Sequence, residues 1–183
     1  MPYDFKSFKN KTNDVSAWLQ KECAQIRTGR ATPNLLDGIS VESFGSKVPL
    51  SQVGSIGTED PKTLRVTPWD MTQAKHIEKA ITVANLGLSV VLDDKGVRVI
   101  FPELSSERRT SLVKLAREKL EEAKKTVRME RDKEWSLIQK KEKEGGMGED
   151  EKFRLKKEME KIVDEVHKKF EDMIVKKEKE ILS

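Results

Sequence analysis

The sequence predicts an α+β fold in which a small α+β domain is inserted into a long three-helix bundle. Charged residues make up 37% of the 183 residues and aromatic residues only 5%. This composition does not suit one large compact core, but it suits long helices that each bury a single apolar stripe. Helical patterns of this kind stand at both ends of the chain, and short β-type runs lie between them.

The first element is predicted to be a helix over residues 4–28. Its apolar residues recur at three-, four- and seven-residue intervals, which keeps them on one helical face; they are Phe5, Phe8, Val15, Leu19 and Ile26. We expect Gly29 to adopt the left-handed conformation that closes a helix, and Pro33 to prevent the helix from resuming. The lone Cys23 is expected to be a small buried apolar residue.

From residue 37 to residue 101 the pattern changes to short β-type runs. They are residues 39–44, 48–56 with interruptions at Pro49 and Gly54, 64–67, 90–92 and 97–101. Asp93-Asp-Lys-Gly96 indicates a hairpin loop between the last two. Residues 71–84 have helical spacing and are closed by Asn85-Leu-Gly87. We expect Asp70 to cap this helix and Trp69 to pack inward.

Two further helices are predicted after Pro102. Ser105 or Ser106 offers an N-cap for a helix that continues to about residue 144, where Gly145-Gly-Met-Gly148 ends it. Its apolar stripe is Leu112, Ala116, Leu120, Ala123, Val127 and Ile138. The third helix carries Leu155, Met159, Ile162, Val166, Phe170, Met173, Ile174 and Ile181 on one side.

Each of these helices is too amphipathic to stand alone, so the first must pack with the last two across the intervening segment. We therefore predict a discontinuous bundle of residues 1–29 and 105–183 and an inserted domain of residues 30–104. Two adjacent connections, near 29–33 and 102–106, would form a natural hinge. Three complementary stripes can satisfy one another in a monomer.

The charge pattern favours a polyanionic partner. The sequence pI is about 9.0, and residues 30–104 hold 8 Lys and Arg against 9 Asp and Glu, so the basic excess lies in the flanking helices. RNA, DNA and an anionic membrane surface all remain open on this evidence. No apolar run reaches the length of a membrane span, and the first residues lack a signal-peptide pattern. We expect a cytoplasmic protein.

The sequence offers no constellation for catalysis, so we do not expect an enzyme. His76 and His167 lie on different predicted helices without carboxylates or cysteines at metal-ligand spacing, and Cys23 has no local signature of a catalytic thiol. Neither glycine cluster, at 54–57 or 145–148, has the context of a phosphate loop. No catalytic residue, metal site or cofactor is predicted.

A basic stripe on the second predicted helix is the stronger signal. At about 100° per residue, Arg117, Lys124, Arg128 and Arg131 fall within a narrow sector beside the apolar stripe and can meet an anion together. A merely solvated face is the alternative. Trp135 continues this stripe and is expected to cap an apolar edge rather than stack on a base.

More arginines stand at the predicted joint. Arg108 and Arg109 lie in the first turn of a helix, where cations are disfavoured, which hints at a role outside stability. Arg27 and Arg30 flank the other connection, and the alternative for them is that they are merely solvated charges at a helix C-terminus, where cations are favoured. Arginine suits phosphate because its planar fork bonds two oxygens at once.

Five stretches carry a family resemblance. They are Arg27-Thr-Gly-Arg-Ala-Thr-Pro-Asn-Leu-Leu-Asp-Gly-Ile, Pro68-Trp-Asp, residues 86–98, Pro102-Glu-Leu-Ser-Ser-Glu-Arg-Arg109 and residues 123–131. Over almost its whole length the sequence resembles bacterial ribosome recycling factor. The resemblance implies a three-helix bundle joined by a flexible elbow to a small α+β domain, with an L shape similar to transfer RNA.

The resemblance also implies a function. Members bind the post-termination ribosome and, with elongation factor G and GTP, promote subunit dissociation and release of messenger RNA and deacylated transfer RNA, without covalent chemistry of their own. By position, the implied contacts to large-subunit RNA are Arg27, Arg30, Arg108, Arg109, Arg128 and Arg131. Arg117 and Lys124 join this candidate set from the helix geometry of the basic stripe. The implied hinge residues are Gly29, Pro33, Leu104 and Ser105.

The chain departs from the family pattern at two places. The family often has Val-Arg-Asn-x-Arg-Arg-Asp where this chain reads Val127-Arg-Met-Glu-Arg-Asp-Lys133, so one arginine is missing and Lys133 is a possible substitute. A common Tyr-Tyr-Gly is Ser43-Phe44-Gly45 here. Two other classes of protein stay open: a coiled-coil scaffold or chaperone, and a general RNA-binding protein with steep salt dependence.

Overall fold

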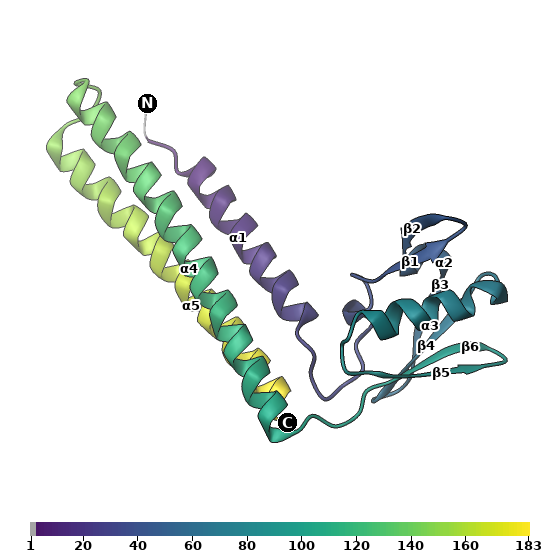
Figure 1. Cartoon of the computed structure of the whole chain (residues 1–183). Helices are drawn as coiled ribbons and strands as arrows, with labels where there is room; N and C mark the ends of the chain where they lie inside the picture. The colour runs from purple at the N-terminus through teal and green to yellow at the C-terminus, as the bar shows by residue number, and fades with distance from the viewer. Residues whose placement is uncertain (1–2) are drawn as a thin grey trace. The chain divides into compact units, whose positions relative to one another are not determined.

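A computed structural model of the protein describes residues 3–183 and divides the chain into two compact units. The first takes in the chain up to Cys23 together with Val113–Lys179, and the second takes in Ala24–Leu112 with Glu180–Ser183. Long helices build the first unit, and a small sheet with a short helix builds most of the second (Figure 1). The predicted α+β fold class is confirmed.

The long helices are α1 (Lys6–Gln25), α4 (Ser106–Lys143) and α5 (Glu149–Leu182). α4 matches its predicted bounds closely, and α5 follows the glycine cluster as expected. Gly145 has φ +75°, and the amides of Gly145 and Gly146 donate to the carbonyls of Glu142 and Lys141, which is the glycine cap that ends α4. The glycine cluster is therefore a turn between helices.

The predicted end of the first helix is wrong. α1 stops at Gln25, and Gly29 is not among the glycines with positive φ. The reason lies in the three residues before Gly29: Ile26, Arg27 and Thr28 are all buried. Three consecutive buried residues cannot share one face of a helix at 100° per residue, so the chain leaves the helical path to bury them.

The apolar stripes of the first unit are buried largely as predicted. On α4, Ala116, Ala123, Val127 and Ile138 are buried, whereas Leu120 is only partly so. The stripe also contains a charged residue, Glu134, which is 8% exposed. Its Oε1 accepts a hydrogen bond from the Tyr3 hydroxyl at 2.9 Å, which provides the partner that a buried carboxylate needs.

The second unit contains, in the described part of the chain, a hairpin and a four-stranded sheet. β1 (Ser40–Ser43) pairs with β2 (Ser46–Pro49). The sheet has the order β3-β4-β6-β5, from Gly54–Asp60, Thr63–Pro68, Gly96–Ile100 and Ser89–Asp93, and all its pairs are antiparallel. The predicted β5-β6 hairpin is confirmed by the pairing of Asp93 with Gly96.

A short helix, α3 (Ala74–Val83), packs on one face of this sheet (Figure 1). Ile77 and Ile81 join Leu64, Val66 and Val99 in a common core. The connection from β2 to β3 holds a one-turn helix, α2 (Leu50–Val53), and single 3-10 turns occupy Pro33–Leu35 and Met71–Gln73. The prediction of a β-type run over residues 48–56 is wrong at α2, which is helical.

Two predictions were made for the turn before α3, one for Asp70, which is confirmed, and one for Trp69, which is wrong. Asp70 caps as expected, since its side chain accepts a hydrogen bond from the Thr72 amide at 2.9 Å. Trp69 was expected to pack inward but is 69% exposed. In β4, Leu64, Val66 and Pro68 are buried in alternation, so the next residue faces away from the core.

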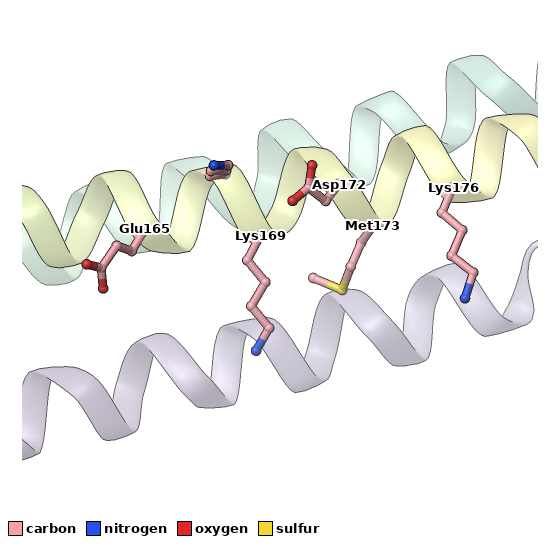
Figure 2. A pocket seen from close by; sticks show the side chains of 6 residues that line it. Glu165, Lys169, Asp172, Met173 and Lys176 are labelled. Carbon is pink, nitrogen blue, oxygen red and sulfur yellow. The ribbon is translucent and has the colours of Figure 1, made fainter.

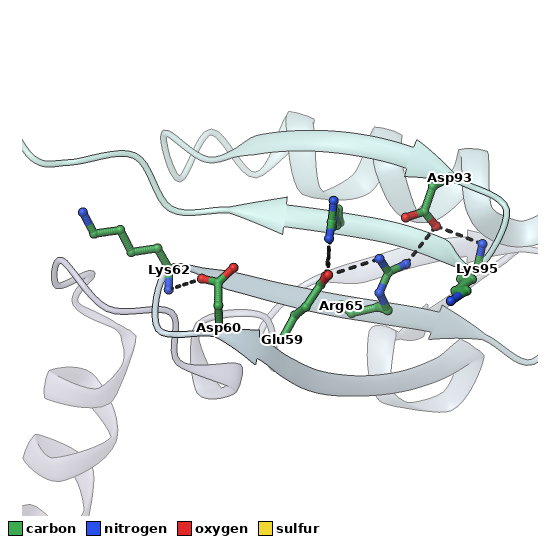
Figure 3. A network of polar contacts seen from close by, with 7 residues as sticks. Glu59, Asp60, Lys62, Arg65, Asp93 and Lys95 are labelled. Atoms are coloured by element: carbon green, nitrogen blue, oxygen red, sulfur yellow. Dashed lines mark hydrogen bonds and ion pairs between the residues drawn. The ribbon is translucent and has the colours of Figure 1, made fainter.

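The other face of the sheet carries a network of charged side chains (Figure 3). Arg65 on β4 lies directly opposite Arg98 on β6, an arrangement of like charges that is unfavourable by itself. Glu59 accepts hydrogen bonds or ion pairs from both arginines, and Asp93 pairs with Arg65 at 2.8 Å. The two acids thus balance the two arginines.

Candidate nucleic-acid interface

Arg27, the first of the predicted RNA contacts, is buried in the second unit with 8% of its surface exposed. Its Nη1 donates to the Gly87 carbonyl at 2.8 Å and its Nη2 donates to the Pro102 carbonyl. The guanidinium also lies 5.9 Å from the centre of the Phe101 ring. Burial, and then the charge of Arg108, lower the pKa of Arg27. In this structure Arg27 therefore joins three segments of one unit, and an RNA phosphate would have to displace these bonds.

The other three arginines of the predicted joint also belong to the second unit. Arg109 is half-buried, and its Nη1 donates to the carbonyl of Ile181 at 2.8 Å, which satisfies an acceptor at the end of α5. Arg30 and Arg108 are exposed, and their guanidinium groups form no hydrogen bond or ion pair with any residue among 3–183. Arg30 and Arg108 are thus the members of this group that are open to a partner.

The basic stripe on α4 runs beside α5. Arg117 pairs with Glu178 at 2.6 Å, and Lys124 pairs with Glu171 at 2.8 Å. Both acceptors lie on α5, so these two cations are partly neutralised inside the bundle. The predicted stripe exists as a row on α4, but half of it also serves contacts between two helices.

Arg128 and Arg131 are the more available half of the stripe. Arg128 is exposed and forms no ion pair with any residue among 3–183. Arg131 pairs only with its neighbour Asp132, at 2.6 Å. Such an exposed ion pair contributes little to stability and is readily exchanged for a stronger anion. These two arginines give α4 its best phosphate-binding positions.

Glu130, which interrupts the family pattern, has partners within the first unit. It accepts from Lys11 of α1 at 2.7 Å and from Lys133 at 2.5 Å, and these hydrogen bonds lower its pKa. Lys133 is therefore not a free substitute for the missing arginine, because its ammonium is bound to Glu130. Trp135 is half-buried, with the Lys156 ammonium 5.6 Å from its ring centre.

His167 lies on α5 next to this stripe. Its Nε2 is buried and has no hydrogen-bond partner among the described residues. Burial, followed by the charge of Lys124, lowers the pKa of His167, while Asp164 and Glu171 act in the opposite direction. The neutral imidazole packs against Phe170, with the ring centres 6.5 Å apart.

The predicted hinge residues occupy the two connections of the second unit. Gly29 has open space around it, whereas the chain is fixed from Ala31 onward, whose amide donates to the Pro61 carbonyl at 2.9 Å. Pro33 begins a 3-10 turn. Leu104 is buried, and the Ser105 hydroxyl accepts from the Arg108 amide at 3.2 Å, so Ser105 is the N-cap of α4.

A second basic feature, on α5, was not predicted from the sequence. Three lysines, Lys168, Lys169 and Lys176, line a hollow of about 430 Å³ together with Met173. In Figure 2, Lys169 and Lys176 extend from α5 toward α1 on either side of Met173. The signal was present, because residues 169 and 176 are two helical turns apart and so share a face. Glu165 and Asp172 line the same hollow and reduce its net charge.

Within residues 3–183 there is no group of three or more His, Cys, Asp or Glu side chains placed to hold a metal ion. In that same part of the chain, no helix has the length and apolarity that crossing a membrane requires.

Comparison with known proteins gives the same family as the motifs in the sequence. The family model described as ribosome recycling factor matches residues 19–182. The ribosome-recycling factor of Rhizobium rhizogenes is 38% identical over 179 residues, which covers 98% of this chain and 96% of the relative. That of Rickettsia conorii is 39% identical over 178 residues, which covers 97% and 96%.

Solved structures give the same result. A solution structure of ribosome recycling factor has a TM-score of 0.75 at 34% identity and covers 97% of this chain. A second match has a TM-score of 0.67 at 36% identity and covers 98% of this chain and 97% of the matched chain. It comes from models described as those of the T. thermophilus ribosome recycling factor and the E. coli elongation factor G bound to the E. coli post-termination complex. Both sequence and fold therefore show that this chain belongs to the ribosome recycling factor family.

Proposed function

We propose that this chain is a non-enzymatic translation factor that recycles ribosomes. It binds the post-termination ribosome in the cytoplasm and, with elongation factor G and GTP, promotes subunit dissociation and the release of messenger RNA and deacylated transfer RNA. The observation that carries the proposal is the family match, which extends over nearly the whole chain in both sequence and fold. The match to a recycling factor described on a post-termination complex with elongation factor G supports the choice of partners.

In this proposal, exposed arginines contact the RNA of the large ribosomal subunit. Arg30, Arg108, Arg128 and Arg131 are the members of the predicted set that are free or bound only to a sequence neighbour. Arginine forks match phosphate oxygens, and the basic excess of the sequence supplies a long-range attraction to RNA. Arg117 and Lys124 would join them by exchanging their α5 partners for phosphate.

The same proposal assigns residues 30–104 to a domain that moves relative to a bundle of residues 1–29 and 105–183. The pivots would be Gly29 with Pro33 on one connection and Leu104 with Ser105 on the other. Support comes from the fixed points that border them, namely the Ala31 amide bonded to Pro61 and the Pro102 carbonyl bonded to Arg27. The chain acts as a monomer, since the buried stripes of α1, α4 and α5 already have partners within it.

Light scattering of post-termination ribosomes tests the proposal. The chain, elongation factor G and GTP are mixed with the ribosomes, and each component is omitted in turn. We expect scattering to fall, as subunits separate, only when all components are present. Scattering that stays constant while the chain sediments with ribosomes would reject recycling, and an absence of ribosome binding would favour a scaffold.

A further inference from the structure

A groove on the first unit lies between α1 and α4 and has a volume of about 370 Å³. From α1 it is lined by Asp14, Val15 and Trp18, and from α4 by Glu122 and Thr126. The volume is within the range of small-molecule sites, which is roughly 300–1,000 Å³. A stable protein interface, by contrast, takes roughly 20–30 residues a side. The groove therefore suits a small ligand.

The groove faces away from the basic stripe of α4. Glu122 stands two residues before Lys124 of that stripe, which places it roughly 200° away around the helix. Thr126 has the same relation to Arg128. The two carboxylates in the groove, Asp14 and Glu122, repel phosphate, so this face does not extend the nucleic-acid interface. A ligand in the groove does not compete with an anion on the stripe.

The ring of Trp18 already contacts one cation. The Lys119 ammonium lies 5.4 Å from the ring centre, and it forms an ion pair with Glu22 of α1 at 3.0 Å. The face of an aromatic ring attracts ammonium groups electrostatically. Lys119 does not line the groove, so the part of the ring that does so is open to a second cation.

Both carboxylates of the groove are available to a ligand. Asp14 is exposed and forms no ion pair with any residue among 3–183. The Glu122 carboxylate pairs with Lys119, three residues earlier on the same helix, at 3.3 Å, and the Glu122 side chain is 56% exposed. Such a pair is weak and is readily exchanged. Because the whole chain has a net charge of +4, its overall field repels cations, and only a local site such as this one attracts them.

We propose that this groove binds a linear diamine, in which a short methylene chain joins two ammonium groups. One ammonium pairs with Asp14 on the α1 wall and the other pairs with Glu122 on the α4 wall. The methylenes cover the apolar surface of Val15 and Trp18. An acid on each wall with apolar surface between them favours this class over Mg²⁺, which has no apolar part. Diamine binding goes beyond the recycling function and does not depend on it.

A bound diamine adds a third link between α1 and α4. Lys11 of α1 pairs with Glu130 of α4 at 2.7 Å. On the other side of the groove, Glu22 pairs with Lys119 at 3.0 Å. A ligand that binds only while both walls are in place stabilises the packing of α1 on α4 by mass action. The diamine concentration therefore controls how readily α1 separates from α4.

The test is an NMR titration of the full chain with cadaverine, a five-carbon diamine, at about 0.1 M salt. Trp18, Trp69 and Trp135 each give one indole N–H signal, which substitution by phenylalanine assigns. We expect only the Trp18 signal to shift, with a dissociation constant on the order of 1 mM. Pentylamine, which has one ammonium group, should bind about fivefold more weakly. Amide hydrogen exchange in α1 should slow about tenfold when cadaverine is at ten times its dissociation constant.

Asp14→Asn and Glu122→Gln should each weaken cadaverine binding about fivefold. Both residues are exposed, so these variants keep the fold. Glu121→Gln is the matched control, because it removes the same charge one residue away on α4, outside the groove, and should leave binding unchanged. Equal weakening by Glu121→Gln, or a common shift of all three indole signals, would show diffuse attraction and overturn the proposal. Displacement of cadaverine by an equal concentration of Mg²⁺, or a Trp18 signal that never shifts, would overturn it as well.

Discussion

Replacing Arg27 by methionine should destabilise the second unit, even though the resemblance places this residue among the RNA contacts. Methionine keeps much of the volume and removes every donor. The carbonyls of Gly87 and Pro102 would each lose a charge-assisted hydrogen bond, for which about 1.5–3 kcal/mol is typical. Burying methionine costs less desolvation free energy than burying a guanidinium, which offsets part of the loss of these two hydrogen bonds. We expect a net loss of about 3 kcal/mol.

Hydrogen exchange resolved by peptide is the suitable assay, because it reports the two units separately. A loss of about 3 kcal/mol corresponds to exchange roughly a hundredfold faster in the most protected amides of β4 and β6. Amides in the middle of α4 and α5 should keep their rates. Arg30→Met is the matched control, because Arg30 is exposed and its replacement should change stability by less than about 0.5 kcal/mol. Unchanged exchange in Arg27→Met, with weaker ribosome binding, would refute the structural role.

Three further predictions follow from exposed and half-buried charges. Arg128→Ala should weaken ribosome binding and reduce the slope of log affinity against log salt by about one, with an unchanged circular dichroism melt. Glu59→Gln should lower the melting temperature of the second unit at pH 7, because Arg65 and Arg98 then lie opposite each other without the Glu59 carboxylate to neutralise them. The pKa of Glu59 is lowered mainly by its hydrogen bond to Arg98. The difference in melting temperature between the two proteins should therefore shrink as pH falls through that pKa, below about 4.5. Because the pKa of His167 is lowered in the folded state, the unfolded chain takes up a proton at this position at a higher pH than the folded chain does. The free energy of unfolding, measured with urea, should therefore fall below about pH 6.5, by at most about 1.4 kcal/mol per pH unit. His167→Gln should remove this pH dependence.

Regular patterns in the sequence were sufficient for most of the fold. Helical spacing with an N-cap serine and a glycine cluster placed α4 at nearly its observed bounds, Ser106–Lys143. Asp93-Asp-Lys-Gly96 placed the β5-β6 hairpin. In these elements the local sequence signals that mark where the element begins, which face it buries and where it ends all agree with the tertiary packing. Contacts distant in sequence were therefore not needed to predict them.

The wrong predictions arose where packing overrode a local signal. A glycine near the end of a helical pattern usually caps it, but here the burial of residues 26–28 ended α1 before Gly29. Trp69 is a large apolar residue, yet the alternation of β4 directs it outward. Period-two alternation through Leu64, Val66 and Pro68 places residue 69 on the side away from the core, and here this pattern outweighs side-chain type.

The residue types of the candidate interface could be predicted from the sequence, but which of its arginines are free to bind a partner could not. Helix geometry gave the row on α4, whereas the acceptors that engage it lie on another helix or on backbone carbonyls far along the chain. Arg27 binds carbonyls 60 and 75 residues away, and Arg117 binds a carboxylate 61 residues away. A side-chain pattern contains no record of backbone acceptors, so sequence alone could not separate structural arginines from exposed ones.

The departure at Glu130 illustrates how this distinction changes a functional expectation. In the sequence, an acid within the α4 stripe suggests weaker RNA binding. In the structure, the Glu130 carboxylate lies between Lys11 of α1 and Lys133, and most of its side chain is buried. Its charge is therefore compensated within the bundle, and it joins α1 to α4. Its repulsion of a bound phosphate is therefore screened. Any loss of RNA affinity from this departure thus comes from the missing arginine rather than from the added carboxylate.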